Sequence, residues 1–244
     1  MAEWFEDWFN SEEYLFVYRH RNEEDAQNLF NLIIKNTSLE NSSKVLDLAC
    51  GAGRHSILFA KNNFIVTGID ISENLLCAAR RTAAELGLQI NFIKADLRNI
   101  NLTDKFHLVI NLFTSFGYFE TDAENEKMIS LAYNCLLDNG YFILDFFNIV
   151  YLRDNLIPIS YDLINDGIIK QERTIQGNRI IKKISIHRNN SVKYYKESVR
   201  AYCKDELVSM ISRNKFNIVR IFGSYNAEIF DEHSSPRVII IAQK

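Results

Sequence analysis

Apolar residues in the first 150 positions gather into short continuous runs, and the segments between them show helical spacing. Five runs have the length of buried strands: 45–48, 65–69, 90–97, 107–113 and 141–147. Unbroken apolar runs are typical of parallel strands whose two faces are both covered. The alternation of strand and helix therefore predicts an α/β fold in which helices cover both faces of a parallel sheet.

Helix starts are marked by polar residues that precede apolar residues spaced three or four apart. Asn22 and Asp122 each precede such a segment, and their side chains are expected to cap its first turn. Ser72 should cap a further helix, which is expected to end at Gly87. The helices after Ser72 and Asp122 lie between predicted strands and would supply crossovers, whereas the one after Asn22 precedes the first strand.

The pattern changes near Tyr151, where helical spacing gives way to β-type runs. These runs span 168–174, 179–187 and 193–202. Turn signals separate them, Gly177-Asn178 after the first run and Asn189-Asn190 after the second. We therefore expect an antiparallel meander, inserted over the C-terminal ends of the parallel strands.

A short helix capped by Asp205 and two closing strands, 216–222 and 238–242, complete the predicted fold. A doubly wound dehydrogenase would more naturally continue with another helical crossover. The closing hairpin is thus the first feature that separates this chain from that class.

Small and polar residues interrupt the apolar pattern where the first strand ends. Asp47 lies within that strand, and the glycine turn 49–53 (ACGAG) follows it. Glycine lets backbone N–H groups approach a ligand closely, because it has no Cβ atom. The second strand ends in Asp70, at the distance from the glycines at which a βαβ unit presents a carboxylate to a ribose diol. A nucleoside-containing cofactor is therefore expected.

The same turn argues against a nicotinamide dinucleotide. Its fingerprint, G-x-G-x-x-G or G-x-G-x-x-A, has glycine or alanine where this chain has Ser56, and the bulky Arg54 and His55 follow the second glycine. A carboxylate at Asp47 would also repel a diphosphate. It suits a cofactor with cationic groups nearby, namely an ammonium and a sulfonium.

The D-x-x-x-G-x-G pattern, with an acid closing the second strand, resembles the class I S-adenosylmethionine-dependent methyltransferases. Family turns often read D-L-G-C-G-x-G, and here Ala49 occupies the position of the first glycine. The resemblance implies a Rossmann-like seven-stranded sheet in the order 3-2-1-4-5-7-6. The last strand would be antiparallel, with helices on both faces and a small antiparallel β insertion.

The resemblance also implies which residues bind S-adenosylmethionine and its product S-adenosylhomocysteine. In the family, the acid that ends the third strand reaches the adenine amine, and the end of the fourth strand faces the methyl group. The implied cofactor-binding residues in and after the strands are Asp47, Ala49, Gly51, Gly53, Asp70, Ile71, Asp96, Leu97 and Asn111.

The segment 14–21 (YLFVYRHR) resembles the N-terminal arm of small-molecule N-methyltransferases that act on amino sugars. That resemblance places Tyr14 and Tyr18 at the methyl group or acceptor as catalytic residues, with Tyr18 also contacting the cofactor. Arg21 would pair with the methionyl carboxylate, a role that Arg19 could exchange with it. The alternative is that the two tyrosines, four residues apart, pack one helix face.

Methyl transfer is an in-line displacement that requires alignment and exclusion of water, so we expect no catalytic triad. No proline follows Asn111, whereas enzymes that methylate nucleobase amines or glutamine side chains carry an Asn/Asp-Pro-Pro-Tyr/Phe motif there. The segment 111–119 (NLFTSFGYF) resembles instead a branch of bacterial small-molecule methyltransferases with an antiparallel insertion after the fifth strand, which implies that the acceptor is a nitrogen or oxygen of a small molecule. Tyr118 and His55 are weaker candidates for the pocket, and the Lys182-Lys183 pair should lie on a solvated face.

Composition narrows the class of partner. The 244 residues carry a net charge of −3, which offers no global positive field for a nucleic acid or a membrane. The four cysteines include no C-x-x-C pair, so no metal site is expected. The N-terminus is acidic and lacks an apolar signal segment, and no run approaches the length of a membrane span, which favours a cytoplasmic protein.

We interpret residues 1–40 as a helical arm or cap, 41–150 and 203–244 as the catalytic core, and 151–202 as the β insertion over the active site. The oligomeric state, monomer or homodimer, stays open. Two other functions also stay open: methylation of RNA or protein, and binding of S-adenosylmethionine by a regulator without turnover.

Overall fold

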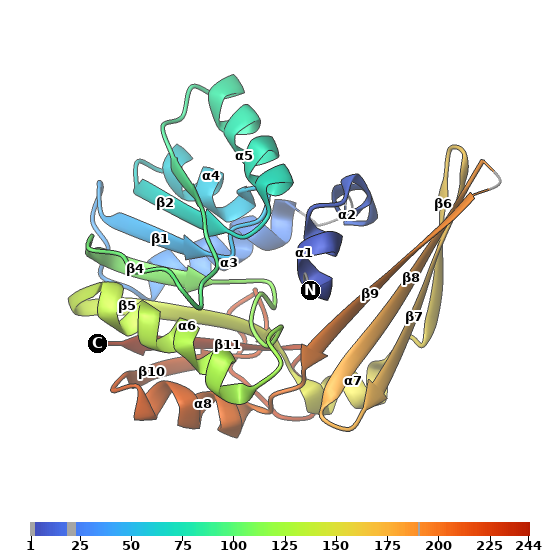
Figure 1. The fold of residues 1–244 in the computed structure, drawn as a ribbon. Coiled ribbons are helices and arrows are strands. Elements are labelled where there is room, and N and C mark those ends of the chain that lie inside the picture. Colours follow the sequence, from blue (N-terminus) through green and yellow to red (C-terminus); the bar gives the residue numbers. More distant parts are fainter. Residues whose placement is uncertain (1–2, 19–22, 190) are drawn as a thin grey trace.

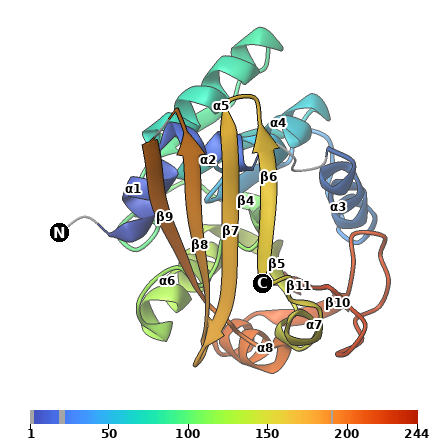
Figure 2. The same ribbon diagram turned by 90° about the vertical axis from the view of Figure 1, so that its right-hand side faces the viewer.

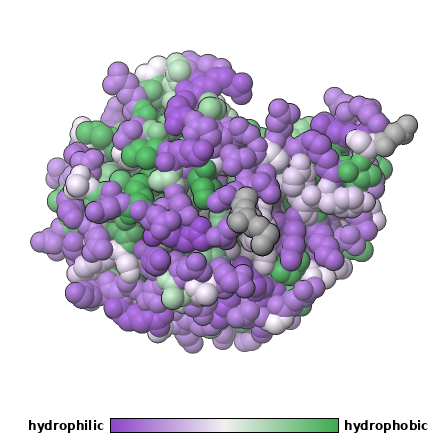
Figure 3. Space-filling model, in the orientation of Figure 1, coloured by the Kyte–Doolittle hydropathy of each residue, from purple (hydrophilic) through white to green (hydrophobic). Residues whose placement is uncertain are grey.

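The computed structural model describes residues 3–18, 23–189 and 191–244. The predicted residues that fall outside these ranges are Arg19, Arg21, Asn22 and Asn190. Two sheets lie side by side, a large one in the body of the molecule and a smaller one at its edge (Figure 1). Hydrophilic side chains cover most of the face shown in Figure 3, with apolar ones interspersed.

The large sheet has seven strands in the order β10-β11-β5-β4-β1-β2-β3. Its strands are β1 (Lys44–Leu48), β2 (Ile65–Asp70), β3 (Asn91–Lys94), β4 (Phe106–Asn111), β5 (Leu136–Phe147), β10 (Asn217–Phe222) and β11 (Arg237–Gln243). The first five are parallel, and β11 runs antiparallel to both β5 and β10. The predicted strand order is confirmed.

Helices cover both faces of this sheet because successive strand residues point to opposite sides. The helices are α3 (Glu23–Lys35), α4 (Arg54–Lys61), α5 (Glu73–Glu85), α6 (Asp122–Cys135) and α8 (Lys204–Arg213). On β4, Leu108 and Ile110 pack in the cluster that contains α3, whereas Val109 packs in the cluster that contains α6 and α8. None of the helices in the described ranges is long and apolar enough to span a bilayer.

The smaller sheet is an antiparallel meander of four strands in chain order (Figure 2). They are β6 (Ile159–Ile164), β7 (Gly167–Gln176), β8 (Arg179–Arg188) and β9 (Ser191–Arg200), and α7 (Ile149–Asn155) precedes them. The sequence did not predict β6. Residues 159–163 (ISYDL) alternate between apolar and polar, which is a strand signal that the prediction did not use, and the structure leaves the apolar set Ile159, Tyr161 and Leu163 exposed.

Two short helices of the N-terminal arm, α1 (Trp4–Phe9) and α2 (Glu12–Val17), lie between the two sheets (Figure 1). Trp8 and Val17 are buried against Ile169, Ile184 and Ile186 of the small sheet. The arm is thereby joined to a part of the chain more than 150 residues away.

The predicted caps are only partly correct. The Ser72 side chain caps α5 as expected, but α6 is capped by Thr121 rather than by Asp122. Thr121 and Glu124 form a reciprocal capping box, which leaves Asp122 inside the first turn. Asp205 likewise lies inside α8, which begins one residue earlier.

Candidate cofactor and acceptor site

A crevice opens at the C-terminal ends of β1, β2 and β4. It has a larger compartment of about 220 Å³ beside the glycine turn and a smaller one of about 70 Å³ toward β3. The two compartments share five lining residues, Phe9, Ala49, Asp70, Ser115 and Tyr118. They therefore form one continuous site with two ends.

A wider hollow of about 610 Å³ lies at the opposite ends of the strands, where Lys44, Ile65 and Asn91 line it. These residues start β1, β2 and β3. In open parallel sheets, ligands bind outside the carboxyl ends of the strands. The crevice, and not the wider hollow, is therefore the candidate site.

Most of the predicted site residues meet at this crevice. Those lining the larger compartment are Tyr14, Tyr18, Asp47, Ala49, Gly51 and Asp70. Those lining the smaller compartment are Ala49, Asp70, Ile71, Asp96 and Leu97. The weaker candidate His55 lines the larger compartment, and Tyr118 lines both.

Gly53 and Asn111 line neither compartment, and Arg21 lies outside the described residues. A Cβ atom on Gly53 would come within 2.9 Å of the Ala79 Cβ, so glycine permits α4 and α5 to approach there. The Asn111 amide donates to the Leu48 carbonyl at 2.8 Å and ties the end of β4 to the end of β1.

Asp70 holds the glycine turn against the end of β2. Its Oδ2 accepts from the Gly51 N–H at 2.7 Å, and its Oδ1 accepts from the Ser72 N–H at 2.9 Å. Burial raises the pKa of Asp70, and these backbone hydrogen bonds oppose the rise. Each carboxylate oxygen can accept a second hydrogen bond, so the group can still receive a ligand's hydroxyl groups.

Asp47 places a second buried carboxylate at the same turn. Burial raises its pKa to about 7, and the negative charge of Asp70 adds to that rise. The Ser56 hydroxyl, which donates to Asp47 Oδ2 at 2.7 Å, and the nearby Arg54 oppose it. Two desolvated carboxylates in one crevice favour a cationic ligand, whose charge would offset their repulsion.

The smaller compartment has apolar walls and one acidic side. Its apolar and aromatic lining includes Phe5, Phe9, Ile71, Leu97, Phe116, Phe119 and Met128. Asp96 stands beside it in an ion pair with Arg98, whose Nη2 lies 2.6 Å from Oδ2. Burial raises the pKa of Asp96, but the hydrogen bonds and charge of Arg98 outweigh that effect and lower it. The compartment suits a flat, largely apolar ring that carries an amine.

The turn after β4 is strained and forms one wall of the larger compartment. Phe113 and Thr114 have φ angles of 57° and 62°, a region that costs non-glycine residues about 1–3 kcal/mol each. The Phe113 ring lines the compartment, stacks on Tyr225 and lies 3.8 Å from the Arg54 guanidinium carbon. Contacts from neighbouring residues must therefore stabilise the positive φ angles of Phe113 and Thr114.

Buried Asp145 on β5 supplies that support. Its Oδ2 accepts from the Phe113 N–H at 2.8 Å, and its Oδ1 accepts from Arg237 Nε at 2.8 Å. Arg237 also donates to the Thr114 hydroxyl at 3.1 Å, and the Tyr225 hydroxyl donates to Asp145 at 3.0 Å. This network was not predicted from the sequence, although a carboxylate inside the apolar run 141–147 is a signal that could have revealed it.

Tyr14 and Tyr18 line the larger compartment and also pack against the small sheet. The Tyr18 hydroxyl meets Lys182, which donates to it at 2.6 Å. The prediction of a solvated Lys182-Lys183 pair is therefore wrong for Lys182, whose side chain is only 12% exposed, whereas Lys183 is exposed. Alternation along β8 places the two lysines on opposite faces of the sheet.

Comparison with known proteins identifies a domain. Residues 45–140 match the family model described as a methyltransferase domain. A putative methyltransferase of a Geobacillus species is 26% identical over 133 residues, which are 54% of this chain and 53% of that protein. A dTDP-3-amino-3,4,6-trideoxy-α-D-glucopyranose N,N-dimethyltransferase of Streptomyces venezuelae is 35% identical over 83 residues, 34% of this chain and 33% of that protein. The chain thus spans about half or less of these relatives.

The fold is shared more widely than the sequence. The CcbJ methyltransferase of Streptomyces caelestis matches with a TM-score of 0.82 at 15% identity, over 96% of this chain and 97% of that one. The chain therefore carries a methyltransferase domain and has the fold of the class I S-adenosylmethionine-dependent methyltransferases.

Proposed function

We propose that this chain, with its class I methyltransferase domain over residues 45–140, transfers a methyl group from S-adenosylmethionine to a nitrogen or oxygen of a small molecule. The observation that carries the proposal is the convergence of Asp47 and Asp70 on one crevice beside the glycine turn. We further propose that residues 1–40 and 151–202 cover this crevice, and that the protein works in the cytoplasm.

The residues present fit the cofactor. Asp70 has acceptor capacity for the two hydroxyls of a ribose, and Asp47 provides negative charge for an ammonium or a sulfonium. The apolar smaller compartment would receive the adenine, with Asp96 close to its amine. When bound, the cofactor supplies a methyl carbon that its positive sulfur has already activated.

The chain's own contribution is alignment and shielding. Aromatic side chains from the arm and from the turn after β4, Phe9, Tyr14, Tyr18, Phe113 and Tyr118, wall the larger compartment. They can hold an acceptor in line with the methyl group and exclude water, and such placement lowers a barrier by several kcal/mol. A nitrogen acceptor is favoured, because the Streptomyces venezuelae relative methylates an amino group of a sugar nucleotide.

Binding and turnover test the proposal in sequence. Calorimetry should detect S-adenosylmethionine and S-adenosylhomocysteine with a Kd on the order of 10 μM. Mass spectrometry should then detect a methylated product when dTDP-3-amino-3,4,6-trideoxy-α-D-glucopyranose, D-glucosamine or glycine is supplied with the cofactor. Absence of cofactor binding at high protein concentration would refute the proposal.

A further inference from the structure

A cluster of four side chains joins the N-terminal arm to the small sheet at the wall of the larger compartment. We call it the Tyr18 cluster: Trp8, Tyr18, Lys182 and Glu197. Glu197 Oε1 accepts from the Trp8 indole N–H at 2.7 Å and from the Tyr18 hydroxyl. Lys182 Nζ donates to the Tyr18 hydroxyl at 2.6 Å and lies 3.6 Å from Glu197 Oε2. The tyrosine hydroxyl is thus held between an ammonium and a carboxylate.

Both charged groups are largely withdrawn from water. The side chains of Lys182 and Glu197 are 12% and 10% exposed. Burying an ion pair costs desolvation energy that its mutual attraction often fails to recover, so stability alone is a weak reason to place one here. Tyr18 lines the compartment, and its hydroxyl contacts both members of the buried charge pair, so this side chain links the pair to the site.

The arrangement matches what proton transfer through a phenol requires. A phenolic hydroxyl both donates and accepts hydrogen bonds, so it can receive a proton from a neighbour while it passes its own to a second group. Glu197 is placed to receive the proton of Tyr18, and the Lys182 ammonium stabilises negative charge on the tyrosine oxygen during the transfer.

We propose that Tyr18 and Glu197 form a proton relay that deprotonates the methyl acceptor, and that the acceptor is an alkyl amine arriving as an ammonium. This inference rests on the proposed function and names the substrate class of the same site. An ammonium has no lone pair with which to attack, so a base accelerates the reaction wherever the amine is protonated. The small sheet then supplies Glu197 as the final proton acceptor of the reaction.

Deprotonation of the ammonium precedes the transfer of the methyl group. An N–H bond of the ammonium breaks, its proton passes to the Tyr18 oxygen, and the Tyr18 proton passes to Glu197, which becomes a neutral acid. The freed lone pair on nitrogen forms a bond to the methyl carbon while the carbon–sulfur bond breaks and its electron pair stays on sulfur. The methylated ammonium and Glu197 afterwards return their extra protons to water.

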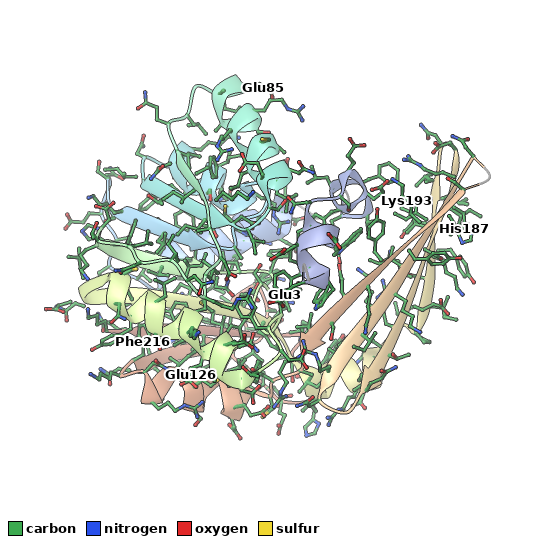
Figure 4. All side chains as sticks on the ribbon, viewed as in Figure 1. Glu3, Glu85, Glu126, His187, Lys193 and Phe216 are labelled. Carbon is green, nitrogen blue, oxygen red and sulfur yellow. The ribbon has the colours of Figure 1, made fainter. Side chains whose placement is uncertain are left out.

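A matched contact on the same interface provides the control. Glu13 of α2 accepts from the Tyr195 hydroxyl at 2.9 Å and pairs with Lys193, so it repeats the Glu, Tyr and Lys set. Figure 4 shows Lys193 on β9 beside α2. Among the described residues, neither Glu13 nor Tyr195 lines the larger compartment. The same substitutions there change the contact between arm and sheet without changing the relay.

The test compares E197Q and Y18F with E13Q and Y195F, using dTDP-3-amino-3,4,6-trideoxy-α-D-glucopyranose, D-glucosamine and glycine as acceptors. Glutamine can still accept from Trp8 and Tyr18 but cannot take a proton. At pH 7 we expect kcat of E197Q and of Y18F to fall by about 100-fold. The deficit should shrink as the pH rises past the pKa of the amine, because the acceptor then arrives unprotonated. E13Q and Y195F should stay within about twofold of wild type at every pH.

Three outcomes would overturn the relay. A deficit in E197Q and Y18F that stays constant with pH would assign them a positioning role only. Wild-type protein that binds the cofactor but methylates none of the three amines would remove the amine class, and the relay with it. A wild type that binds no cofactor would refute the proposed function itself, and calorimetry separates that case from the others. If E197Q does not fold, the pH dependence of kcat in Y18F alone tests the relay, because phenylalanine preserves the packed ring.

Discussion

The two ends of this crevice are built in different ways. The cofactor end, named for the ligand that we propose there, consists of the turn 49–53 and the acids Asp47, Asp70 and Asp96, each at or near the end of a parallel strand. The acceptor end, named likewise for the ligand that we propose there, is lined by the arm and the turn after β4, and the arm packs against the small sheet. Its contacts join distant parts of the chain: the Tyr18 hydroxyl and Glu197 are 179 residues apart.

This difference determines which part of the site can be recognised from the sequence alone. A strand, a glycine turn and a helix place backbone N–H groups and carboxylates by local geometry, so the cofactor end can be recognised from spacing. A buried ion pair between an arm and a sheet depends on how the whole chain packs. We therefore expect substitutions at the cofactor end to act on ligand binding and those at the acceptor end to act on turnover.

The largest effect is expected at the buried pair of Asp145 and Arg237, which supports the turn after β4. Replacing Arg237 by methionine leaves the fully buried Asp145 without its cation. The free energy of unfolding should fall by about 3–5 kcal/mol, as measured by urea denaturation. The control is R213M, which breaks the more exposed pair with Glu126 and should cost at most about 1 kcal/mol. Equal losses in the two variants would contradict the supporting role of the buried pair.

The next effect depends on pH and tests the charge at the cofactor end. Because burial raises the pKa of Asp47 from 3.8 to about 7, the folded protein keeps a proton that the unfolded chain releases between those values. Asp47 therefore makes its full contribution to the free energy of unfolding below about pH 4, and this contribution disappears as the pH rises to about 7. D47N removes this dependence and should be more stable than wild type above pH 7 by roughly 2–4 kcal/mol.

Cofactor binding should strengthen as the pH rises, whereas the stability contributed by Asp47 falls. A cationic cofactor stabilises ionised Asp47, so wild type should release a proton on binding and bind more tightly as the pH rises through about 7. D47N should bind more weakly and without that pH dependence. Urea titrations from about pH 5 to about pH 9 and calorimetry in two buffers of different ionisation enthalpy measure both effects. Parallel stability curves for D47N and wild type would refute the assignment.

The smallest effect concerns the backbone of the glycine turn. Ala49 has a φ angle of 60°, which disfavours a side chain, whereas Ala52 is absent from the residues with positive φ. A49G should therefore raise the free energy of unfolding by about 0.5–1 kcal/mol, and A52G should lower it. Thermal denaturation of both variants measures the difference. The same sign for both would show that the turn stores no such strain.

The sequence predicted the order of the large sheet through its resemblance to the class I methyltransferases, and it predicted the meeting of Asp47 with Asp70 through their short spacing from the glycine turn. It placed Lys182 in solvent, since no local pattern shows that a strand will pack against an arm 164 residues away. It also missed Asp145, whose partner Arg237 lies 92 residues further along the chain. The carboxylate inside the apolar run 141–147 could have marked Asp145, but identifying its partner, or that of Lys182, requires the tertiary fold.

Calorimetry of the Asp70→Ala variant will show whether carboxylates at the strand ends hold an adenosyl cofactor. The control is Asp138→Ala, which removes a carboxylate that is 95% exposed. We predict that D70A weakens S-adenosylmethionine binding by more than about tenfold, through loss of the hydrogen-bond acceptors for the ribose, while D138A binds as wild type does. Wild-type affinity in a folded D70A variant would contradict the claim.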